Sequence, residues 1–183
     1  MTTPQFDQFV GTKPVEERHR FDEAALAAWM RTHVSTFRGA LQVEQFKGGQ
    51  SNPTYRLTAE GQHYVLRRKP PGKLLPSAHA VDREYRIMSA LATTDAPVPR
   101  MIAFHLGRDV IGTPFYLMDR LDGRVFHDNA LPGLAPAESR AVFLSMARTL
   151  ARLHSVDFAA VGLGDYGRRS EEHTSELQSH SFI

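Results

Sequence analysis

Phe46-Lys47-Gly48-Gly49-Gln50-Ser51-Asn52-Pro53-Thr54-Tyr55-Arg56-Leu57 is the segment around which the rest of the chain is organised. It places two glycines and three small polar residues between two strand-like segments, Leu41–Lys47 and Pro53–Ala59. Adjacent glycines let the backbone turn tightly and approach a ligand closely. A strand, a glycine-rich turn and a second strand can lay backbone N–H groups over phosphate oxygens. The stretch predicts a loop that covers a nucleotide, although a Gly-Gly pair alone is also typical of an ordinary turn.

A third strand-like segment, Gln62–Lys69, follows the first two. Glu60-Gly61 fits a two-residue hairpin turn between the second and third segments. Pro70-Pro71-Gly72 ends the third strand, because proline cannot donate to the ladder of hydrogen bonds. The pattern predicts an antiparallel meander with the glycine-rich loop at its first connection.

Helical and strand patterns surround this meander. Residues 1–20 are polar and are expected to form an irregular arm. Asp22 is expected to cap a helix from Glu23 to about Val34. The later elements are expected to be a helix from Ser77 to about Ala92, strands at Met101–Leu106 and Pro114–Leu121, and a helix from Pro136 to about Ser155. Apolar residues lie on more than one side of the last helix, so it is expected to need cover on more than one side.

The composition is that of a soluble globular protein, with 183 residues, 42% hydrophobic and 23% charged. Lys and Arg number 22 against 20 Asp and Glu, and the basic residues are dispersed except around Arg67-Arg68-Lys69 and Arg168-Arg169. The chain therefore lacks the basic footprint of a nucleic-acid binder. It contains no cysteine, which excludes disulfides and thiolate zinc sites. No apolar run approaches the roughly 20 residues that span a bilayer, and the N-terminus lacks the regions of a signal peptide. We therefore expect no membrane partner and a cytoplasmic location.

Three further motifs follow the glycine-rich loop. In Tyr64-Val65-Leu66-Arg67-Arg68-Lys69, strand alternation puts Arg67 and Lys69 on one face and Arg68 on the other. In Asp82-Arg83-Glu84-Tyr85, Glu84 lies next to the apolar stripe of the second expected helix. Phe115-Tyr116-Leu117-Met118-Asp119-Arg120-Leu121-Asp122-Gly123 is a strand that runs into a turn.

With these motifs in this order, the chain from Phe21 to Asp165 resembles the aminoglycoside phosphotransferase and choline kinase-like family. It most resembles the branch related to the kinase-like domains of acyl-CoA dehydrogenase fusions. The resemblance implies an α+β, protein-kinase-like small lobe, with a five-stranded antiparallel sheet plus a helix, preceded by an N-terminal helix. Residues 21–121 would form this lobe, and residues 122–168 the hinge and the start of a truncated large lobe.

The resemblance also implies an ATP site. The loop N–H groups and the side chains of Ser51 and Asn52 would donate to phosphate oxygens. Arg67 takes the place of the phosphate-binding lysine, with Lys69 as the alternative, and Glu84 would pair with that cation. The hinge backbone, through the Asp119 carbonyl and the Leu121 amide, would bind the adenine edge, with Met118 behind it. The implied cofactor-binding residues are Gly48, Gly49, Gln50, Ser51, Asn52, Arg67, Glu84, Met118, Asp119 and Leu121.

The family's catalytic loop, H-x-D-x-x-x-x-N, and its later magnesium-binding aspartate do not occur in this sequence. His127-Asp128-Asn129 and His154-Ser155-Val156-Asp157 have the wrong spacing. We therefore assign no catalytic residue and no metal ligand. The intact parent is expected to use ATP and Mg²⁺ to phosphorylate a small-molecule hydroxyl, and this chain is expected to be inactive. The alternative is a non-catalytic kinase-like module that binds nucleotide or acts as a scaffold.

The last residues, 169–183, resemble the translation of a sequencing-library adapter. On this interpretation the native sequence ends near Arg168 and the tail is disordered and without function. The alternative is an ordinary disordered polar terminus.

Overall fold

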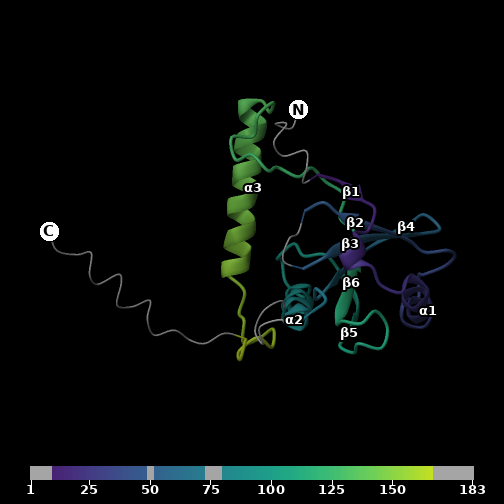
Figure 1. Cartoon of the computed structure of the whole chain (residues 1–183). Helices are drawn as coiled ribbons and strands as arrows, with labels where there is room; N and C mark the ends of the chain where they lie inside the picture. Colours follow the sequence, from purple (N-terminus) through teal and green to yellow (C-terminus); the bar gives the residue numbers. More distant parts are fainter. Residues whose placement is uncertain (1–9, 49–51, 73–79, 167–183) are drawn as a thin grey trace.

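The computed structural model describes residues 10–48, 52–72 and 80–166. Its centre is an antiparallel sheet of six strands in the order β1-β2-β3-β4-β6-β5 (Figure 1). The strands are β1 (Thr12–Lys13), β2 (Gln42–Phe46), β3 (Thr54–Ala59), β4 (Gln62–Arg68), β5 (Met101–His105) and β6 (Phe115–Asp119). Helices α1 (Glu23–His33) and α2 (Val81–Leu91) flank the sheet on opposite sides, and α3 (Pro136–His154) stands apart from it (Figure 1). This architecture confirms the predicted α+β class.

The meander lies where the sequence places it. β2 pairs with β3 and β3 pairs with β4, all antiparallel. Ala59 lies opposite Gln62, and the two turn residues have positive φ, 44° at Glu60 and 77° at Gly61. Two residues with positive φ are the mark of the two-residue hairpin turn that matches the strand twist.

The N-terminal arm is more regular than the sequence suggested. β1 pairs with β2 through Thr12–Phe46 and Lys13–Gln45, and a short 3-10 helix spans Glu17–His19. A two-residue strand is too short to show an alternation pattern, so the sequence did not predict it. The sheet therefore has one strand more than the five expected.

The helices start and end close to their expected positions. The Asp22 carboxylate accepts the Ala25 N–H at 2.8 Å and caps α1 as predicted. α2 begins at Val81, and the expected cap Ser77 lies outside the described residues. Pro136 occupies the first turn of α3, where its missing N–H costs nothing.

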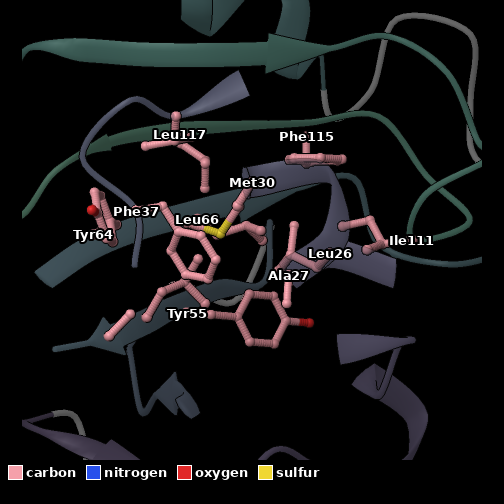
Figure 2. Close-up of a cluster of buried hydrophobic side chains, with 13 residues drawn as sticks. Leu26, Ala27, Met30, Phe37, Tyr55, Tyr64, Leu66, Ile111, Phe115 and Leu117 are labelled. Carbon is pink, nitrogen blue, oxygen red and sulfur yellow. The ribbon is translucent and has the colours of Figure 1, made fainter. Parts of the chain in front are cut away.

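The hydrophobic core lies between α1 and one face of the sheet (Figure 2). Leu26 and Met30 of α1 are fully buried against side chains that alternate along β3, β4 and β6. These strand residues are Tyr55, Leu57, Ala59, Tyr64, Leu66, Phe115 and Leu117. Because side chains alternate along a strand, every second residue of these strands points into the core. The residues between them lie on the opposite face, with α2 and with polar side chains.

α3 buries none of its residues. Phe143, Met146 and Leu150 are exposed by 51%, 61% and 52%. An apolar helix face of this kind is typical of an interaction surface. Within the described ranges, no helix is long and apolar enough to cross a bilayer.

Candidate functional site

Polar side chains converge on the sheet face opposite the core. In an antiparallel pair, directly opposed residues share a face. Arg67 lies opposite Thr54 on one side and opposite Tyr116 on the other. Val65 lies opposite Met118 in the same way. This face therefore carries an arginine, a threonine and a tyrosine side by side, with an apolar pair next to them.

The Glu84 carboxylate from α2 is the centre of this polar group. Its Oε2 accepts a hydrogen bond from Arg67 Nε at 2.7 Å, and its Oε1 one from Arg67 Nη2 at 3.4 Å. The ion pair is partly buried, with side-chain exposures of 27% for Arg67 and 33% for Glu84. The pair that the sequence led us to expect between the strand cation and the helix glutamate is present, and it involves Arg67 rather than Lys69.

Two more groups donate to the same carboxylate. Asn52 Nδ2 donates to Oε1 at 2.8 Å, and the Tyr116 hydroxyl donates to Oε2 at 3.0 Å. Asn52 is buried and is the last residue of the glycine-rich loop. Glu84 thereby joins the end of that loop to β4, β6 and α2.

Sequence reasoning missed Tyr116 and Thr54. Arg67 Nη1 donates to the Thr54 hydroxyl at 3.3 Å, which fixes the guanidinium from the β3 side. Burial raises the pKa of Tyr116, and the Glu84 charge raises it further, so the phenol stays protonated and remains a donor. Both residues alternate correctly for this face, but the strand register is needed to show that they meet Arg67.

The loop itself is described only at its ends. Gly48 and Asn52 lie within the described residues, and the predicted phosphate-binding residues Gly49, Gln50 and Ser51 lie outside them. Their assigned role therefore stays a prediction.

The hinge residues follow β6. Met118 is half-buried on the same face as Arg67, and Leu121 is 67% exposed. The Asp119 N–H donates to the Arg100 carbonyl at 2.9 Å, and its carboxylate accepts two bonds of 2.9 Å from the Arg100 guanidinium. These contacts anchor the end of β6. The contacts of the Asp119 carbonyl and the Leu121 amide with adenine stay a prediction.

Arg68 faces the other way, as alternation predicts. It is only 2% exposed, and its guanidinium donates to the carbonyls of Ile111 at 3.2 Å and His19 at 3.3 Å. The rings of Phe21 and Tyr55 lie 5.1 and 5.7 Å from its central carbon, within cation–π range. Arg68 fixes the N-terminal arm to the core and takes no part in the polar face.

Two acidic residues that the sequence analysis set aside have local roles. Asp128 Oδ1 accepts the Ala130 N–H at 2.9 Å, and Asp157 Oδ1 accepts those of Ala159 and Ala160 at 3.0 Å. Such bonds are typical of turns. Over residues 10–48, 52–72 and 80–166, no three His, Asp or Glu side chains gather closely enough to hold a metal ion.

The chain is similar to curated proteins that are much longer than itself. It is 44% identical over 160 residues to rat acyl-CoA dehydrogenase family member 11, which covers 85% of this chain and 20% of the relative. The chicken protein of the same name is 46% identical over 162 residues, covering 86% and 21%. Mouse acyl-CoA dehydrogenase family member 10 is 40% identical over 169 residues, covering 92% and 16%. The chain thus spans about a fifth of these relatives.

A solved structure shares the fold. A Ralstonia eutropha protein assigned as an aminoglycoside phosphotransferase superposes with a TM-score of 0.72 and 46% identity. The similarity covers 90% of this chain and 50% of that one. The structural match confirms the protein-kinase-like fold.

The phosphotransferase enzyme family matches residues 42–181. This span runs past Arg168 into the segment that we assign to an adapter, whose origin stays a prediction. It also contains the strands and the helix that bring Arg67, Glu84 and Tyr116 together. Because the match covers more than half of the sequence, the chain belongs to the phosphotransferase enzyme family.

Proposed function

We propose that this chain forms the nucleotide-covering part of an ATP-dependent phosphotransferase that moves the γ-phosphoryl group to a hydroxyl of a small molecule. The observation that supports the proposal best is the Glu84 cluster, which we define as the Glu84 carboxylate with its donors Arg67, Asn52 and Tyr116. It joins Arg67 of β4 to Asn52 at the end of the glycine-rich loop, in a chain of the phosphotransferase family. A cation held by a helix glutamate beside such a loop is how kinase-like folds hold phosphates.

Arg67 would contact phosphate oxygens. A guanidinium carries five N–H donors in a planar fork, and Glu84 and Thr54 accept three hydrogen bonds from it. The fork therefore keeps donors for a phosphate while Glu84 fixes its orientation. Backbone N–H groups at positions 48–52 would cover the same phosphates. The backbone of Asp119 and Leu121, with the Met118 side chain, would meet the adenine.

Mg²⁺ does not fit the residues that the structure describes, because their carboxylates do not gather into a metal site. The sequence also lacks the family's catalytic loop. In this proposal the acceptor-orienting aspartate and the metal ligands belong to the rest of the parent protein. The exposed apolar face of α3 supports such a missing partner. The names of the relatives favour an acceptor derived from an acyl-CoA, such as a hydroxyacyl-CoA, and a cytoplasmic location remains our expectation.

A non-catalytic module that binds nucleotide or acts as a scaffold is the second candidate. The missing catalytic loop favours it, because binding needs no acceptor-orienting base. The genomic reading frame separates the two. An H-x-D-x-x-x-x-N motif encoded downstream of Arg168 supports the enzyme, and a genuine stop codon there supports the module.

The proposal is tested on the chain as it exists. A fluorescent ATP analogue is titrated into the protein, and phosphoryl transfer from radiolabelled ATP is assayed with candidate acceptors. We expect saturable binding that unlabelled ATP reverses, without turnover. Binding that does not saturate would contradict the nucleotide site, and turnover would contradict the assignment of catalysis to the missing part.

A further inference from the structure

The outer side of α2 is attached to a segment 76 to 83 residues later in the chain. Arg83 Nη2 donates to the Tyr166 carbonyl at 3.0 Å, and the Tyr166 hydroxyl donates to the Arg83 carbonyl at 3.3 Å. The Arg83 guanidinium also lies 4.8 Å from the centre of the Tyr166 ring. Three different interactions therefore join one residue of α2 to one residue of the segment 162–166.

Arg86 makes the second attachment. Its guanidinium donates to both carboxylate oxygens of Asp165, at 3.2 Å for the longer bond, and to the Gly162 carbonyl at 2.8 Å. The hydrogen bonds from Arg86 lower the pKa of the Asp165 carboxyl. A single exposed ion pair contributes little, but a two-pronged arginine contact within a network is the exception.

Glu84 lies between these two arginines in the sequence, but its side chain points to the sheet and not to the segment 162–166. Residues 83 and 86 are three apart and share one side of the helix. Residue 84 is rotated by about 100° from residue 83 and meets Arg67, Asn52 and Tyr116. The neighbouring Tyr85 ring stacks on Phe104 of β5 at 5.0 Å. One short helix is therefore held from outside by the segment 162–166 and from inside by the sheet.

We propose that the segment Gly162–Tyr166 is a positioning element. It fixes the position of α2 along its axis and its rotation, so that the Glu84 carboxylate meets Arg67. Arg86 and Asp165 are its positioning residues. They act on the nucleotide only through Glu84 and Arg67. The consequence for ATP affinity rests on the proposed function, while the consequence for the Arg67–Glu84 pair does not.

The Arg67–Glu84 ion pair can be followed directly through the NMR signal of the Arg67 side chain. In a ¹⁵N-labelled chain, the Arg67 Nε–H signal is identified by its loss in Arg67→Lys. Arg86→Ala, or Asp165→Asn where the first variant folds poorly, is expected to move this signal towards that of an exposed arginine and to speed its exchange with water. The charge-swapped pair Arg86→Asp with Asp165→Arg should restore it. Arg31→Ala removes a charge from the exposed side of α1 and serves as the matched control. An Arg67 signal unchanged in both Arg86→Ala and Asp165→Asn would overturn the proposal.

ATP affinity gives the second readout. Arg86→Ala should weaken binding roughly 2- to 5-fold, the range of a modest ion-pair network. The same substitution in an Arg67→Ala background should have no further effect. An equal loss in both backgrounds would overturn the route through Arg67. If the wild-type chain binds no ATP but the Arg67 signal still responds, the proposed function fails and the positioning role stands.

Discussion

The two faces of the sheet differ although the same strands build them. The face towards α1 is closed and, apart from Arg68, apolar, with Leu57, Leu66 and Leu117 fully buried. Figure 2 shows Leu66 and Leu117 in this core. The face towards α2 carries the Arg67–Glu84 pair and remains partly accessible. The adjacent arginines Arg67 and Arg68 show the contrast best, because one is held by a carboxylate and the other by carbonyls and aromatic rings. One face thus stabilises the fold, and the other carries the polar group that we propose binds nucleotide.

The largest expected effect comes from the closed face. Leu66→Ala should lower the free energy of unfolding by about 3 kcal/mol, because it opens a cavity in a fully buried site. The measurement is urea unfolding followed by circular dichroism. Thr58→Ala, next to Leu57 on the opposite face of β3 and only half-buried, is the control and should cost clearly less. Equal losses of unfolding free energy would contradict the assignment of the stabilising core to the α1 face.

Arg68→Ala should cost about 2 kcal/mol. It removes the hydrogen bond to the Ile111 carbonyl and one of the two hydrogen bonds to the His19 carbonyl, which the Tyr55 hydroxyl also reaches at 2.9 Å. It also removes the cation–π contacts with Phe21 and Tyr55. Arg68→Met keeps an apolar side chain of similar length, so it should recover part of the loss in the same unfolding assay. If both variants unfold like the wild type, Arg68 does not anchor the N-terminal arm.

The smallest effect belongs to the Tyr116 hydroxyl. Tyr116→Phe removes one hydrogen bond to Glu84 and should cost about 1 kcal/mol at pH 8. The pKa of Tyr116 is raised in the folded chain, so its stabilisation is complete below the ordinary tyrosine pKa of about 10 and is lost as the pH rises above it. Unfolding midpoints of the two proteins should therefore converge between pH 8 and 10.5. A difference that stays constant or grows would contradict this assignment.

Much of the fold follows from local sequence signals. Alternation places Tyr55 and Leu57 in the core, the Glu60-Gly61 dipeptide sets the hairpin, and Asp22 caps α1. The order of motifs was enough to expect the Arg67–Glu84 pair, because each residue occupies a definite place on one strand and one helix.

The rest depends on contacts that no local pattern encodes. Tyr116 joins the site only through the register between β4 and β6, and β1 is too short to show an alternation. The contact of Arg86 with Asp165 depends on the path of a loop 79 residues away. These features need the assembled structure, because they arise from the pairing of distant segments.

We propose that the polar face, held together by Glu84 and Arg67, binds ATP. The decisive experiment is calorimetric titration of ATP into the wild-type chain and into Arg67→Ala. We expect the wild type to bind with a 1:1 stoichiometry and Arg67→Ala to bind about 10-fold more weakly, which corresponds to about 1.4 kcal/mol. The free energy of unfolding should change by less than about 1 kcal/mol, since the pair is partly exposed. Equal affinity of the two proteins for ATP would contradict the claim.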